Sequence, residues 1–260
     1  MKGFILASLF LLSHLETSAQ TGLIKTIDLD KIKHVTLDRA GDIYVNTSSS
    51  LIKFDKDGKK LGELSNFQCT SFDTGNGVRL LAYNRKEQQY TILTPTLTTV
   101  KKTPIDNSIA ITPWLVCSSG DYNILLLDVA DWSIKKVDTR QGKVLNEFKI
   151  DSTLTESSQL ISLCEYQNFI FLLDTQTGIT IFNSLGLKVK TIEVKGVPAF
   201  HFLGQELYYY RDGRVHFFDL FTTETRFEDI PGSFDSVLLT DERMIGIKPG
   251  RLEIDTYDSK

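Results

Sequence analysis

The chain has 260 residues, of which 41% are hydrophobic and 24% are charged. This balance can fill a sizeable core, and it differs from the low-hydrophobicity, high-charge composition of disordered chains. A formal net charge of −4 offers no basic surface for nucleic acid or anionic lipid, so we expect neither as a partner.

Residues 1–19 have the order of a secretory signal. Lys2 precedes a largely apolar run, residues 3–15, which is followed by small residues up to Ala19. The run is shorter than the roughly 20 apolar residues that a spanning helix needs. We therefore predict cleavage near Ala19 and export to the periplasm or exterior of a bacterium. The mature chain, residues 20–260, is expected to form one domain without inserting into the membrane.

Short runs rich in β-branched and aromatic residues recur along the mature chain, separated by Gly, Asn, Asp and Ser, and long helical periodicity is absent. A unit of four short strands repeats about every 40 residues, as a propeller blade requires. The innermost strand of each unit is expected at residues 34–38, 70–73, 115–118, 160–164, 199–203 and 236–240. The second strand of each unit is expected to end at Asn46, Asn84, Asp128, Asp174, Arg211 and Lys248.

The two ends of the chain complement each other. The last unit stops after its third strand, near Tyr257, whereas residues 23–29 form a spare strand ahead of the first unit. If the spare strand completes the last blade, the ring closes without an unpaired edge. The sequence therefore predicts an all-β fold, a six-bladed β-propeller closed by an N-terminal strand.

The clearest units have an apolar strand ending in Asp or Asn, a short polar turn, and a second apolar strand ending in Asp or Asn, followed by Gly and another strand. This order resembles the NHL-repeat group of six-bladed propellers, most clearly at residues 42–64, 123–148 and 169–192. The resemblance implies a fold and a habit of binding partners on one face of the disc. Fold does not fix function.

Some propellers of this architecture are calcium-dependent lactonases, and the resemblance implies for them a ring of Glu, Asn and Asp at the channel mouth. The inner strands here lack the Glu-Gly-Pro opening of those enzymes, and no nucleophile elbow, phosphate loop or zinc-protease motif is present. The channel could receive His34, Asp38, Asp73, Glu165, His201 and Asp241. We favour a non-catalytic protein without cofactor or metal, and a calcium-dependent hydrolase or lactonase stays as the alternative, as does a sugar- or peptide-binding propeller.

Several other polar residues have a structural interpretation. Cys69, Cys117 and Cys164 fit as small buried side chains, although an oxidising compartment leaves a Cys117–Cys164 disulfide open. His34 and His201 fall in units that are not adjacent, so we predict no metal site between them. The Asn and Asp residues that end the second strands are expected to bond the backbone of the following turn.

The turns after the second strands and the loops between units are expected to share one face of the disc. Tyrosines 208–210 should alternate into the packing between blades, which leaves Arg211 and Asp212 free. Arg is enriched where interfaces carry their binding energy. For Trp132, both loop packing and ligand contact stay open. The candidate binding residues of this face are Arg85, Asn107, Trp132, Arg211 and Asp212.

These observations favour a protein-interaction or scaffolding module of the bacterial cell envelope. An accessory subunit of an outer-membrane assembly is one form that such a module could take. The expected partner is a protein of the envelope, and a small-molecule ligand stays open, with sugar or peptide binding in the channel as the form that Tyr, Trp and Asn would suit.

Overall fold

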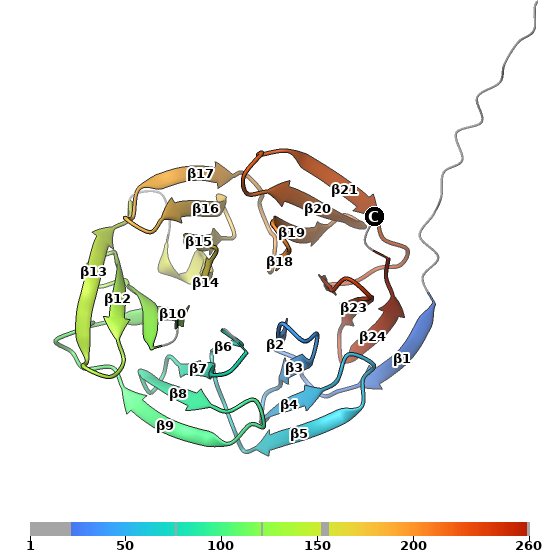
Figure 1. Cartoon of the computed structure of the whole chain (residues 1–260), viewed down its shortest axis with the longest axis horizontal. Coiled ribbons are helices and arrows are strands. Elements are labelled where there is room, and N and C mark those ends of the chain that lie inside the picture. The colour runs from blue at the N-terminus through green and yellow to red at the C-terminus, as the bar shows by residue number, and fades with distance from the viewer. Residues whose placement is uncertain (1–21, 76, 121, 152–155, 259–260) are drawn as a thin grey trace, which may run out of the picture.

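The computed structural model describes residues 22–75, 77–120, 122–151 and 156–258, which form a ring of six four-stranded antiparallel sheets (Figure 1). The predicted signal, residues 1–19, lies outside the described residues. In the part that is described, the single helix is the short 3₁₀ turn η1 (Ser157–Gln159), and no helix is long and apolar enough to cross a membrane.

The blades follow one another along the chain, and each runs from the central axis outward. Blade 1 contains β2 (His34–Leu37), β3 (Ile43–Asn46), β4 (Ser50–Phe54) and β5 (Lys60–Ser65). Blade 2 contains β6 (Ser71–Asp73), β7 (Leu80–Asn84), β8 (Gln89–Leu93) and β9 (Thr99–Pro104). Blade 3 contains β10 (Pro113–Ser119), β11 (Asn123–Asp128), β12 (Ser133–Asp138) and β13 (Lys143–Lys149).

The second half of the ring repeats this order. Blade 4 contains β14 (Leu160–Tyr166), β15 (Phe169–Asp174), β16 (Gly178–Asn183) and β17 (Lys188–Ile192). Blade 5 contains β18 (His201–Leu203), β19 (Glu206–Arg211), β20 (Arg214–Asp219) and β21 (Thr225–Asp229). Blade 6 contains β22 (Ser236–Leu239), β23 (Arg243–Lys248), β24 (Arg251–Thr256) and β1 (Leu23–Asp28). Every second strand ends at the residue that the sequence indicated.

The N-terminal strand closes the ring, as predicted. β1 pairs antiparallel with β24, from Leu23 opposite Asp255 to Asp28 opposite Arg251. The Nζ of Lys25 donates a 2.7 Å hydrogen bond to the carbonyl of Gly58, so the same strand also contacts blade 1. The outer edge of blade 6 is therefore built from both ends of the folded chain.

The core consists of apolar layers between neighbouring blades. One layer joins Leu115 and Leu127 of blade 3 to Leu163 and Phe182 of blade 4, and a similar layer fills each of the other seams. Middle strands are covered on both faces, which explains why β15 is an almost uninterrupted apolar run. The outer strands are mostly exposed.

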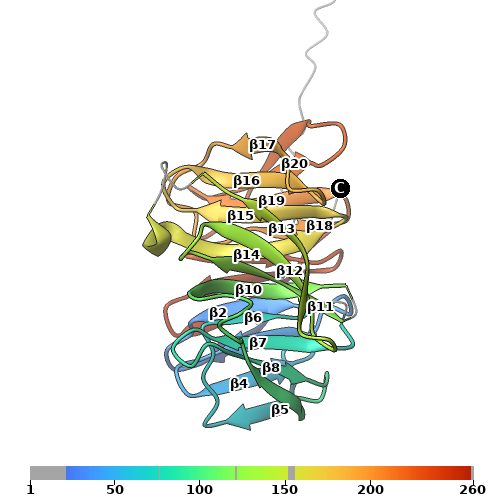
Figure 2. The ribbon, with the colours of Figure 1, turned by 90° about the vertical axis from the view of Figure 1, so that its left-hand side faces the viewer.

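The two faces of the disc differ in the segments that they carry (Figure 2). Because the strands of a blade are antiparallel, the turns between second and third strands lie at the same end as the connections to the next blade. We call this side the connection face. At each seam, the connection donates a backbone hydrogen bond of 2.8–3.0 Å to the neighbouring turn: Leu29 to Gly250, Phe67 to Ser49, Ile105 to Gln88, Ile150 to Trp132, Gly196 to Thr175 and Ile230 to Gly213.

Deleting Leu23–Asp28 should destabilise the whole ring, because it exposes the edge of β24 and uncovers the layer between blades 6 and 1. We expect a lower Tm and concentration-dependent oligomers in size-exclusion chromatography. The matched control is a chain that begins at Gly22 and retains β1. Equal Tm values and a monomeric deletion variant would show that closure by β1 is dispensable.

Candidate functional site

A group of side-chain contacts between neighbouring blades lies on the connection face over blades 2 and 3. The Arg85 guanidinium sits 3.6 Å from the centre of the Trp114 ring, and its Nε donates a 2.8 Å hydrogen bond to the Trp114 carbonyl. The indole Nε1 of Trp114 in turn donates to the Leu160 carbonyl at 3.0 Å. Arg85 and Trp114 are both half-buried, and this chain of contacts links the inner parts of three successive blades.

The connection between blades 2 and 3, residues 105–112, is fastened at both ends. Ile105 donates its backbone N–H to Gln88, and the amides of Ile111 and Thr112 each donate 2.9 Å hydrogen bonds to the carboxylate of Asp128. Asn107 lies exposed at the middle of this segment, and the side chain of Ile111 is 65% exposed. A fixed loop thus presents one large apolar side chain to solvent.

Asp128 is the buried anchor of this arrangement. Its carboxylate also accepts a 3.1 Å hydrogen bond from Lys135, and both residues are almost fully buried. Burial raises the pKa of Asp128, but hydrogen bonds from backbone amides and Lys135 outweigh that effect and hold its pKa below the ordinary value. The carboxylate is therefore ionised at neutral pH and orients the loop above it.

Trp132 also lies at this place, in the turn after β11. Its backbone is in the left-handed region, with φ of 55°. Its half-buried ring packs with Trp114, Phe148 and Ile150 against the layer between blades 3 and 4. Loop packing therefore accounts for part of this side chain, and its predicted role in binding stays a prediction. We call Arg85, Asn107, Ile111, Trp114 and Trp132 the blade 2–3 surface.

Arg211 and Asp212 lie apart from this surface, in blade 5, with blade 4 between (Figure 1). Neither side chain packs between blades, and Arg211 Nε and Asp212 Oδ2 form a 3.1 Å ion pair with each other, so their predicted role in binding stays a prediction. Both side chains are exposed, so this pair adds little to stability. Tyr208 and Tyr210 are buried between blades 5 and 6, and Tyr209 packs towards blade 4, as their alternation predicted.

The residues that end the second strands largely do what turn chemistry requires. Asn84 accepts the N–H of Glu87, and Asp174 accepts that of Gln176, at 3.3 and 2.7 Å. Asn46 departs from the pattern, because its Nδ2 instead donates to the carbonyl of Cys69 in the connection to blade 2. These side chains hold turns and seams together.

Polar residues near the central axis do not converge into a metal site. Among the described residues, no group of three or more His, Cys, Asp or Glu side chains could hold a metal ion. The carboxylate of Asp73 accepts hydrogen bonds from the backbone amides of Gly75 and Ser118, at 2.8 and 2.7 Å. Burial lowers the pKa of His34, and burial together with His34 lowers the pKa of His201 to about 3, so both imidazoles are neutral at pH 7.

The cysteines are free thiols. Cys117 packs in the layer between blades 3 and 4, whereas Cys164 packs towards the layer between blades 4 and 5. The two side chains therefore lie on opposite faces of blade 4, and the disulfide that the sequence left open does not form here.

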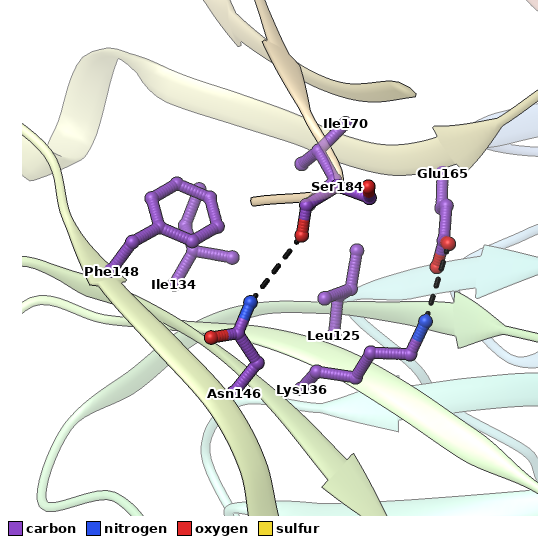
Figure 3. A pocket seen from close by; sticks show the side chains of 8 residues that line it. All are labelled: Leu125, Ile134, Lys136, Asn146, Phe148, Glu165, Ile170 and Ser184. Atoms are coloured by element: carbon purple, nitrogen blue, oxygen red, sulfur yellow. Dashed lines mark hydrogen bonds and ion pairs between the residues drawn. The ribbon is translucent and has the colours of Figure 1, made fainter. Parts of the chain in front are cut away.

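A small cavity lies between blades 3 and 4 (Figure 3). Leu125, Phe148 and Ile170 give it apolar walls, and Lys136 reaches Glu165 across it at 3.4 Å. Its volume of about 10 Å³ admits a single water molecule. The cavity is too small for a substrate.

The sequence analysis named Arg85, Asn107 and Trp132 as candidates for this surface and did not name Trp114 or Ile111. Trp114 begins an inner strand, where a large side chain is ordinarily assigned to the core. Only the contact with Arg85, contributed by the previous blade, shows that this ring belongs to the connection face.

Replacing Asp128 with Asn should destabilise the protein by about 2–4 kcal/mol at pH 7, because it removes the charge that pairs with buried Lys135. Because the pKa of Asp128 is lower in the folded protein than in the unfolded chain, its ionised carboxylate stabilises the wild type above about pH 4. This contribution to the free energy of unfolding is lost as the pH falls further. Urea unfolding at pH 7 and at about pH 3 should therefore show a difference between wild type and variant that shrinks in acid. Exposed Asp212→Asn is the control, and a difference independent of pH would contradict the assignment.

Comparison with known proteins supports the fold and does not assign a family or a function. No protein-family model and no curated protein matches the sequence. Among solved structures, BamB from Moraxella catarrhalis is similar at 12% identity and a TM-score of 0.50, covering 88% of this chain and 86% of that one. The BBS1 N-terminal domain, solved in complex with ARL6, has 14% identity and a TM-score of 0.56 over 88% and 78%. The β-propeller domain of Cps50 (Swd1) from Myceliophteria thermophila has 10% identity and a TM-score of 0.61 over 92% and 100%. At these identities the likeness establishes that the chain is a β-propeller.

Proposed function

We propose that this chain is a non-catalytic interaction propeller that binds a protein partner through the blade 2–3 surface. The observation that carries the proposal is the Arg85 guanidinium stacked on Trp114 on the connection face. Arg and Trp are among the residues that most often dominate interface energies, particularly where they are held in place before binding.

The surroundings of this pair support the same use. Ile111 is exposed on a loop fixed by Asp128 and Gln88, so little conformational entropy is lost when a partner covers it. A preformed Arg–Trp pair beside an exposed aliphatic side chain resembles the central part of a protein interface. The similar BBS1 propeller, solved with ARL6, is itself part of a protein complex.

The proposal includes the place where the partner is met. We propose that residues 1–19 direct export and are removed after Ala19, so that the partner is a protein of the bacterial envelope or exterior. Intact mass measurement of the chain recovered from the periplasm and the culture medium should give a protein beginning at Gln20. A cytoplasmic protein with an intact N-terminus would reject this part.

We also propose that the repeated units are of the NHL type, which the order of strand, polar turn and Gly favours. An alignment of homologues in which the six units do not share that order would reject the grouping. The interaction role does not depend on it.

A photo-crosslinking residue at position 111 should capture one protein in the native envelope. Arg85→Ala should weaken that capture by about 30-fold, the effect of losing a hot spot worth about 2 kcal/mol. Arg140→Ala, an exposed arginine in the β12–β13 turn on the opposite face, should leave it unchanged. The same probe at Leu185, which is 73% exposed on the opposite face, is the positional control.

Two outcomes would contradict the assigned surface. Equal capture from positions 111 and 185 would mean that the adduct is not specific to the connection face. Capture that survives Arg85→Ala, with the Tm of the variant unchanged, would exclude the Arg85–Trp114 pair as the anchor.

A further inference from the structure

A second feature of the connection face lies at the seam of blades 1 and 2. The structure has a cleft of about 300 Å³ there, at the lower end of the range for small-molecule sites. Its walls come from Ser49 in the β3–β4 turn, from residues 66–68 of the connection, and from the blade 2 strands β8 and β9. Asn84 and Glu87, which flank Arg85 in sequence, complete the lining.

The connection between blades 1 and 2, residues 66–70, is short and is held against the neighbouring turn. Phe67 donates its backbone N–H to Ser49 at 3.0 Å, and the Nδ2 of Asn46 donates to the carbonyl of Cys69 at 3.2 Å. At the next seam the longer connection, residues 105–112, folds over the turn that contains Gln88. The shorter connection leaves the space beside the β3–β4 turn uncovered, and side chains of both blades line it.

The lining is rich in hydrogen-bonding groups that the protein leaves unused. In the described part of the chain, the side-chain amides of Asn66, Gln68 and Gln89 have no hydrogen-bond partner. Glu87 and Lys102 contribute one negative and one positive charge, so the cleft has no net charge. It therefore offers several donors and acceptors without favouring an anion or a cation.

One lining residue is apolar. The half-buried ring of Phe67 packs against the layer between blades 1 and 2, which fixes its orientation, and it borders the cleft. Among the lining residues that the structure describes, no other is apolar, so the cleft has no recess for an apolar anchor of the kind by which peptides usually dock.

We propose that this cleft binds a neutral carbohydrate of one or two sugar units. Each amide has both a donor and an acceptor, which matches hydroxyl groups that both donate and accept. The Phe67 ring offers an apolar surface to the C–H face of a sugar ring. The proposal is independent of the protein partner inferred above.

The test is saturation-transfer NMR and calorimetry on the purified full chain, with maltose, cellobiose, lactose and chitobiose as probes. We expect at least one of them to bind, and the double variant Asn66→Ala/Gln89→Ala to weaken it by about tenfold or more, since each lost hydrogen bond contributes about 1 kcal/mol. Phe67→Leu, which keeps an apolar side chain, should reduce saturation of the sugar C–H protons. The matched control is Gln176→Ala, an exposed glutamine in the corresponding turn of blade 4.

Three results would overturn the proposal. The first is that no probe binds at up to about 10 mM, ten times a weak Kd of about 1 mM. The second is a sugar that binds equally well to the double variant, which would place its site elsewhere. The third is that an uncharged tripeptide binds in the cleft and the sugars do not, which would assign the cleft to peptide.

Discussion

The pairing of β1 with β24 brings together residues as distant as Gly22 and Thr256, 234 positions apart, and the layer between blades 6 and 1 depends on it. Each apolar layer is formed by two neighbouring blades. In an open ring, the first and last blades would each expose one apolar face to solvent. Contacts between the chain ends close a loop of more than 200 residues, so their formation costs conformational entropy that the pairing must offset. The layer between blades 6 and 1 is therefore complete only when the two ends of the chain pair.

Closure also determines how the axial residues are used. The edges of the inner strands face the axis, and side chains of the adjacent blade satisfy their backbone groups: the Ser71 hydroxyl donates to Val116, and Asp73 accepts from Ser118. The Tyr208 hydroxyl bonds both the carbonyl and the amide of Leu239 in the same way. Polar groups near the axis therefore have structural partners, and the proposed binding sites lie at the seams of the connection face.

The connections differ from seam to seam, whereas the blades repeat one four-stranded design. Strand pairing and burial constrain the blades, whereas the connections need only bridge neighbours and bond one turn. A long connection over blades 2 and 3 builds a raised surface around Arg85, and a short one between blades 1 and 2 leaves a cleft beside Gln89. One repeated scaffold thus offers two chemically distinct surfaces on one face.

The sequence by itself determined the repeat, the residue at which each second strand ends, the closing strand, and the turn roles of Asn84 and Asp174. These follow from short-range rules: alternating burial along a strand and hydrogen bonds within a turn. Only the tertiary structure decided that Arg85 stacks on Trp114, that Cys117 and Cys164 face different seams, and that a cleft opens beside Gln89. Such contacts depend on the angle and spacing at which two blades pack, and no pattern within one blade specifies them.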